Sequence, residues 1–159
     1  MYGVFGGLFG IGSGELVVVT SQPREHASLA APAGARVVEQ HFLLPTVRPE
    51  TPGSLERPGV YVFRFFHVKN ADVDEIVRVS AEAWVTFENT DAYRSEPQAL
   101  FSPRDRQPER GWMLLLTWYD GFASWETSRQ PAPQARASFA RRHALTFGTI
   151  AYATRLIER

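Results

Sequence analysis

Arg64 is the residue of this sequence that most plainly invites chemistry, because it interrupts a run of apolar β-branched and aromatic residues over positions 60–68. A guanidinium buried in such a run needs an anionic partner or several hydrogen-bond acceptors. One interpretation is that Arg64 binds the carboxylate or enolate of a ligand. The other is an ion pair with a neighbouring acid, for which Glu15, Glu39 and Asp120 are the candidates.

Two histidines are candidate proton carriers. His67 ends the same run and falls on the face opposite Arg64, since strand side chains alternate between faces. An imidazole can accept a proton near pH 7, although a single histidine at a strand end also suits the boundary of a core. His41 lies in an apolar segment beside Glu39 and Gln40. We take Arg64, His67 and His41 as candidate catalytic residues.

Aromatic side chains are numerous, at 13% of the chain, and suggest a pocket for a flat ligand. Trp112 and Trp118 are six residues apart and therefore share one face of a strand. With Phe66 and Tyr152 they are the candidate pocket residues. The alternative is that these rings fill the core, where aromatic side chains supply large apolar area.

Metal and cofactor sites have little support in the sequence. The four histidines do not occur at the spacing of metal ligands on a helix or hairpin. The chain has no cysteine, which excludes disulfides, thiolate metal sites and a cysteine nucleophile. We expect neither a metal nor a cofactor.

The elements that must position these residues are predicted from hydrophobic periodicity and turn signals. The run at 60–68 is apolar on both faces, which predicts a strand buried on both sides. The spacing of Asp72 and Glu75 predicts a capping box at a helix start, and Phe147-Gly148 predicts a helix end. The predicted order is strand 60–68, helix 72–89, strand 98–102, strand 112–119, helical turn 120–129, helix 134–145 and strand 149–157. This is the βαββαβ order of a ferredoxin-like α+β unit with an antiparallel sheet.

The first third of the chain resembles the later part of that unit. Segments 8–9, 15–21 and 34–44 parallel segments 100–101, 113–119 and 148–157. We therefore expect residues 1–48 to be a partial repeat, equivalent to strands two to four, and 49–57 to be a linker. Residues 58–159 are then the complete unit.

Composition limits the range of partners. Seventeen basic side chains balance seventeen acidic ones, so the positive field that attracts nucleic acid or anionic membranes is absent. No apolar run approaches the length of a membrane span. We expect a cytoplasmic protein that binds neither nucleic acid nor membranes.

Two short motifs resemble the NIPSNAP family of the dimeric α/β-barrel superfamily. They are Arg64-x-Phe66 on the first strand and Trp118-Tyr119-Asp120-x-Phe122-Ala123 after the third. The resemblance covers residues 58–157 and implies two sheets that face each other and close a barrel around a lumen. Either the two parts of this chain supply both sheets as a pseudo-dimer, or two chains form a homodimer.

The first repeat lacks a counterpart of the first strand, which in a ferredoxin-like sheet lies between strands three and four. Either its segments 15–21 and 34–44 pair directly, or a strand of another copy fills the gap.

Two functions follow from this resemblance. One is a small cofactor-independent enzyme of the monooxygenase or isomerase type, in which Arg64 stabilises an oxyanion of an apolar or aromatic metabolite and a histidine or tyrosine moves the proton. The other is a non-catalytic module with a filled barrel, which binds a small molecule or another protein. An open lumen lined by Arg64 and a titratable group favours the enzyme.

Overall fold

The computed structural model describes residues 2–21, 31–51 and 53–157. These residues form one antiparallel sheet of seven strands in the order β2-β1-β7-β4-β6-β5-β3. The strands are β1 (Gly3–Phe9), β2 (Leu16–Val19), β3 (Leu43–Pro45), β4 (Val60–Lys69), β5 (Ser95–Pro103), β6 (Arg110–Tyr119) and β7 (Thr146–Leu156). The helices are a short 3-10 turn η1 (Asn70–Asp72), then α1 (Val73–Phe87), α2 (Phe122–Thr127) and α3 (Pro133–Ala144).

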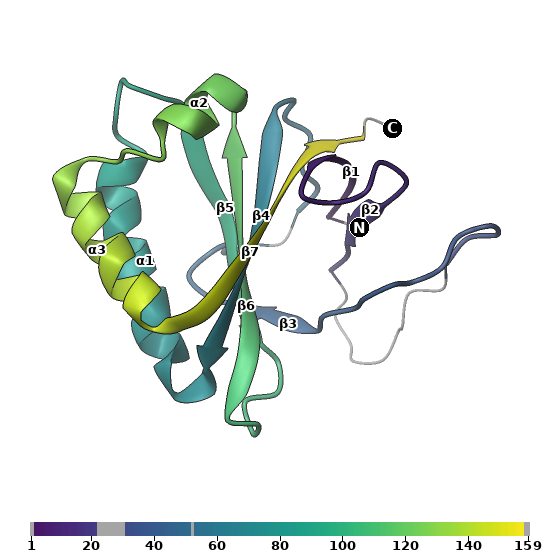
Figure 1. Cartoon of the computed structure of the whole chain (residues 1–159), viewed down its shortest axis with the longest axis horizontal. Coiled ribbons are helices and arrows are strands. Elements are labelled where there is room, and N and C mark those ends of the chain that lie inside the picture. The colour runs from purple at the N-terminus through teal and green to yellow at the C-terminus, as the bar shows by residue number, and fades with distance from the viewer. Residues whose placement is uncertain (1, 22–30, 52, 158–159) are drawn as a thin grey trace.

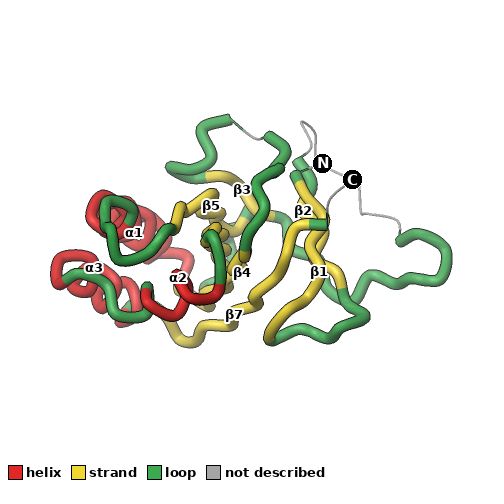
Figure 2. The backbone as a smooth tube through the Cα atoms, turned by 90° about the horizontal axis from the view of Figure 1, so that it is seen from above, coloured by secondary structure: helices red, strands yellow, loops and turns green. Residues whose placement is uncertain are grey.

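The helices cover one side of this sheet. Helices α1 and α3 lie together on that side, and the β1–β2 hairpin lies on the other (Figure 1). Viewed from above, the sheet curls away from the helices, so that its two ends approach the same side (Figure 2). We call the side under α1 and α3 the helix-facing side and the other side the concave face.

Strand β4 lies at the centre, between β6 and β7. Its side chains alternate between the two sides, and residues 60–63 are all at most 2% exposed. The prediction of a strand buried on both faces is confirmed for residues 60–63, whereas Arg64, Phe65 and His67 are only partly buried. Toward the concave face β4 contributes Tyr61 and Phe63 to a cluster with Phe5, Leu116 and Trp118.

The helix-facing side contains two separate apolar clusters. Phe66 and Val68 of β4 pack against Ile76 and Trp84 of α1. Val60 and Val62 of β4 pack with Phe87, Tyr119, Ala135 and Ala153. The apolar spacing of α1 explains how one helix reaches both clusters, because its buried residues recur every three or four positions.

The start of α1 differs from the predicted capping box. Asp72 makes no side-chain hydrogen bond to the helix, and η1 leads directly into it. The Glu75 carboxylate instead accepts from Arg78 and Arg141, at 2.6 and 2.7 Å. Guanidinium donors from α1 itself and from the adjacent helix α3 therefore hold Glu75, and it does not reach back to the backbone.

Helix α3 also ends differently from the prediction. It stops at Ala144 with Leu145 at its C-cap, and Phe147 and Gly148 lie inside β7. The prediction that Gly148 terminates the helix is therefore wrong. The β7 strand is irregular at this point, because its register with β4 shifts between His67 and Val68.

The first third contributes to both ends of the same sheet. Strand β1 pairs with β2 and with β7, whereas β3 pairs with β5 at the opposite end. Of the strand predicted over 34–44, only the end forms, at Leu43–Pro45. Segments 15–21 and 34–44 do not pair directly, because β2 and β3 are the two outermost strands. Within the described residues the two parts of the chain build one sheet and not two facing sheets.

Substitution of Phe5 measures how much the first third of the chain contributes to the stability of the core. Its ring is fully buried and lies edge-on against Tyr61 and Phe63, with centroids at 5.2 and 4.9 Å. We expect Phe5→Ala to lower the free energy of unfolding by about 3–5 kcal/mol, because it removes a buried ring and leaves a cavity. Val85→Ala, at a position that is 68% exposed on α1, should change it by about 0.5 kcal/mol or less.

Chemical denaturation of both variants measures this difference. Equal stability of the Phe5→Ala and Val85→Ala proteins would contradict the packing of β1 on the concave face.

Candidate functional site

The concave face is divided into a filled part and an open part. Register places Tyr61, Phe63, Phe65 and His67 of β4 on this face. Tyr2 and Phe5 cover the part near Tyr61 and Phe63. Phe65 and His67 remain only half-buried. Any ligand on this face must therefore lie at the His67 end of β4.

Trp118 belongs to the filled part. Its side chain is 4% exposed, and its indole Nε1 donates to the carbonyl of Pro58 at 3.0 Å. The Arg57 guanidinium carbon lies 3.2 Å from the centroid of its ring. Trp118 and Trp112 share a face as predicted, but these contacts make Trp118 a core residue.

His67 lies between two aromatic rings, which together form what we call the His67 cluster: His67, Trp112 and Phe147. The imidazole stacks on Trp112 with centroids 4.8 Å apart and an interplanar angle of 23°. Its centroid is 5.6 Å from that of Phe147. Gly148 is opposite His67 on β7, and a β-carbon there would meet no atom within 4 Å. The missing side chain leaves space beside the imidazole.

A second imidazole lies on the same face. The His41 ring is 5.1 Å from Phe65, and Phe65 in turn lies 5.9 Å from Tyr152. Nε2 of His41 is 2.8 Å from the Glu39 carboxylate. His41 lies in the non-strand segment that precedes β3. The concave face thus brings together four of the predicted residues: His41, His67, Trp112 and Tyr152.

Arg64 and Phe66 do not join this group. They alternate with His67 along β4 and therefore lie on the helix-facing side. The expectation that Arg64 faces the interior of the barrel is corrected by this register. Within residues 2–21, 31–51 and 53–157, Arg64 has no ion pair with Glu15, Glu39 or Asp120. Burial lowers the pKa of Arg64, and the nearby positive charge of Arg129 lowers it further.

Sequence reasoning missed one aromatic member of this arrangement, Phe147, which it assigned to a helix end. On the helix-facing side it gave no role to Arg142. Arg142 is in fact 6% exposed. The spacing Ala135, Phe139, Arg142 could have identified it, since i, i+4 and i+7 lie on one helical face.

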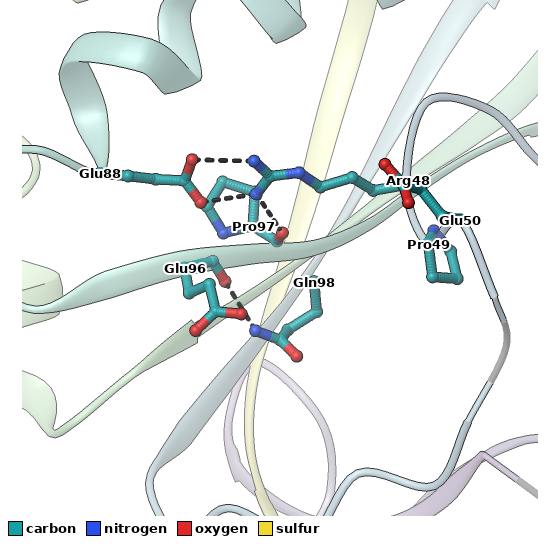
Figure 3. A pocket seen from close by; sticks show the side chains of 7 residues that line it. All are labelled: Arg48, Pro49, Glu50, Glu88, Glu96, Pro97 and Gln98. Carbon is teal, nitrogen blue, oxygen red and sulfur yellow. Dashed lines mark hydrogen bonds and ion pairs between the residues drawn. The ribbon is translucent and has the colours of Figure 1, made fainter.

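Two surface cavities lie elsewhere. One of about 340 Å³ is lined by residues around Arg48 and Glu88 (Figure 3). The other, of about 350 Å³, is lined by Glu56, Pro58, Gly59, Val60, Asp120, Gly121, Phe122, Arg155 and Leu156. Neither contains a predicted site residue. In the part of the chain that the structure describes, no three potential metal ligands among His, Asp and Glu form a group.

Arg48 already has partners in the first cavity. Its Nη1 and Nη2 donate to the two carboxylate oxygens of Glu88 at 2.5 and 2.9 Å, and Nη1 also donates to the Pro97 carbonyl at 2.9 Å (Figure 3). The guanidinium carbon lies 4.9 Å from the Trp84 ring centroid. These contacts tie the segment after β3 to the end of α1 and to β5. We interpret this cavity as the surroundings of a structural ion pair.

Comparisons with known proteins indicate a fold and no closer relationship. No family model matches the sequence, and no curated protein matches it. One solved structure, described as that of an anthrone oxidase-like protein, superposes with a TM-score of 0.53 at 19% sequence identity. The match covers 74% of this chain and 52% of that one, so this chain spans about half of its length. At this identity the likeness concerns the fold alone, an α+β fold built on one curled antiparallel sheet.

The helices of the described residues offer no candidate for a membrane span, since none combines the required length and apolar character.

The Arg48–Glu88 pair gives a stability prediction. We expect Arg48→Gln and Glu88→Gln each to lower the free energy of unfolding by about 1–2 kcal/mol, because each leaves a half-buried charge without its bidentate partner. The double variant should lose less than the sum of the two. Arg106→Gln breaks a pair whose Asp74 side chain is 85% exposed, and it should cost about 1 kcal/mol or less.

Urea unfolding of the four variants provides the measurement. Strict additivity of Arg48→Gln and Glu88→Gln would contradict the coupling.

Proposed function

We propose that this chain is one subunit of a homodimer in which two curled sheets close a barrel, and that the lumen binds a flat aromatic ligand at the His67 cluster. The observation that carries the proposal is the half-buried imidazole stacked on Trp112 and bordered by Phe147, with space left by Gly148. Aromatic rings prefer offset or edge contacts with other rings. A planar ligand therefore fits beside this cluster.

The proposed unit is ferredoxin-like and related to the NIPSNAP family. The neighbouring strands β7-β4-β6-β5 have the order that such a unit requires, with the first strand between the third and fourth. The Arg64-x-Phe66 motif lies on β4, and Trp118-Tyr119-Asp120 lies at the end of β6. We further propose that the first third is a partial repeat of this unit, made of the β1–β2 hairpin and β3.

The distribution of apolar surface supports closure by a second copy. Fourteen large apolar side chains are exposed among the described residues, and two of them, Val85 and Phe122, lie on helices. The other twelve lie in the first third or on and just after β7. Extended exposed apolar surface on soluble proteins marks interaction sites. Ile150 is 44% exposed on β7 opposite Phe65, on the concave face itself.

In the enzyme form of the proposal, His67 removes a proton from an acidic carbon of the bound aromatic compound. Anthrone is a suitable probe, because the solved structure with a similar fold is described as anthrone oxidase-like. Anthrone and dioxygen give anthraquinone and water. His67 takes one C10 proton, the resulting anion forms a bond to dioxygen at C10, and His67 returns the proton to give a C10 hydroperoxide. Loss of the second C10 hydrogen with cleavage of the O–O bond then leaves the C10 carbonyl and releases water. His41 and Tyr152 lie on the same face as further proton donors or acceptors.

A second candidate is a non-catalytic binding module. The packed half of the concave face favours it, since Tyr2, Phe5 and Trp118 already fill the space that a larger ligand would need. Binding and turnover measurements separate the two candidates.

Dimer formation is tested by native mass spectrometry and light scattering. We expect a mass twice the 17.9 kDa of the chain. Ile150→Glu should give a monomer, because it places a charge where apolar faces meet, whereas Val85→Glu on exposed α1 should leave the dimer intact. A wild-type monomer would overturn the homodimer.

Ligand binding and turnover are tested with anthraquinone and anthrone. Quenching of tryptophan fluorescence by anthraquinone should saturate with wild type and weaken in Trp112→Leu. Aerobic conversion of anthrone should exceed the buffer rate and fall about 100-fold or more in His67→Gln. His143→Gln, at an exposed position on α3, is the matched control.

Quenching without turnover would support the binding module. Absence of both would reject the proposed site on the concave face.

A further inference from the structure

The helix-facing side of β4 is interrupted by a charge at its middle. Val60 and Val62 belong to one apolar cluster, and Phe66 and Val68 belong to the other. Arg64 stands between them on the same side of the strand. The two clusters are therefore separated by a guanidinium.

A second guanidinium reaches this layer from α3. Arg142 is 6% exposed, and its guanidinium carbon lies 4.8 Å from the Phe66 ring centroid and 4.7 Å from that of Phe139. Its Nη1 donates to Ser80 Oγ at 3.3 Å, and Ser80 donates in turn to the Ile76 carbonyl at 2.7 Å. The rings and the hydroxyl fix the position of the arginine and leave its other donors available.

The charge of Arg64 acts on Arg142. Burial and the positive charge of Arg64 lower the pKa of Arg142 to about 9. In the described part of the chain, neither arginine has an acidic partner. The nearby acid Glu75 is held by Arg78 and Arg141. Two like charges in a poorly solvated layer are unfavourable unless an anion compensates them.

The layer can be reached from solvent across β7. Ala151 is opposite Arg64, and Thr149 is opposite Phe66, so both share the helix-facing side. Both residues are small and exposed, and Arg64 itself retains some accessible surface. Arg129, an exposed residue that acts on the charge of Arg64, adds a third positive charge.

We propose that the space between α3 and the β4–β7 pair is an anion site, in which Arg64 and Arg142 bind a small oxyanion of the carboxylate or phosphate class. Guanidinium groups suit both, because their parallel N–H donors match pairs of oxygens. The site is on the opposite side of β4 from His67, so it is independent of the proposed aromatic site.

Isothermal titration calorimetry tests this site with sodium phosphate, sodium acetate and sodium benzoate, each at constant ionic strength against sodium chloride. We expect saturable binding of at least one of them. Binding of phosphate alone would indicate a phosphate ligand, and binding of acetate or benzoate a carboxylate. Arg64→Met and Arg142→Gln should each weaken binding about tenfold or more, because each removes a charged donor pair.

The matched control is Arg78→Met, which removes an exposed arginine on α1 that pairs with Glu75 and Glu82. It should leave anion binding unchanged. Thermal unfolding in chloride gives a second readout: Arg64→Met should raise the melting temperature, since it relieves the unpaired charge, and it should remove the stabilisation by the bound anion. No saturable binding by wild type, or equal binding by Arg64→Met, would overturn the proposal.

Discussion

Burial of β4 on both sides is the constraint on which the rest of the structure depends. Ten residues of β4 pair with β6, and the strand also pairs with β7 along most of its length. Tyr61, Phe63 and Phe65 pack in or against the concave cluster, whereas Val60, Val62, Phe66 and Val68 enter the two helix-facing clusters. A slip of one residue would exchange these sets. It would place Arg64 among the aromatic rings and His67 beneath α1.

The apolar packing on the two sides of β4 is incomplete in different ways. On the concave face the first third of the chain supplies Tyr2 and Phe5 over one half only, which leaves the His67 cluster partly open. On the helix-facing side the apolar layer is interrupted by Arg64 and Arg142. The ionisable side chains of His67, Arg64 and Arg142 therefore lie where the apolar packing of a single chain is incomplete. Association with a second copy and binding of a small anion would each complete one side.

The sequence predicted the elements with strong periodicity and failed where a local signal competed with the sheet. Strand β4 was predicted from a continuous run of β-branched and aromatic residues, and helix α1 from apolar residues that recur every three or four positions. Arg64 and His67 are an odd number of positions apart on one strand, so the sequence correctly predicted that they lie on opposite faces. It could not say which face the helices cover, because both faces of β4 are apolar. Residues 34–42 have the composition of a strand, yet they find no partner strand in the sheet. Gly148 looked like a helix end because glycine suits both a C-cap and an irregular strand.

The placement of β2 and β3 affects how this protein can associate. Each of these outermost strands is short, with four and three residues, and Pro45 in β3 cannot donate a backbone hydrogen bond. Strand β3 pairs directly with the edge of β5. Strand β2 pairs with β1, which in turn covers the edge of β7. Short edge strands and proline discourage the addition of foreign strands, which leads to fibrous aggregation. The molecule can thus keep an apolar face available for a partner while its backbone edges stay poor templates for uncontrolled growth.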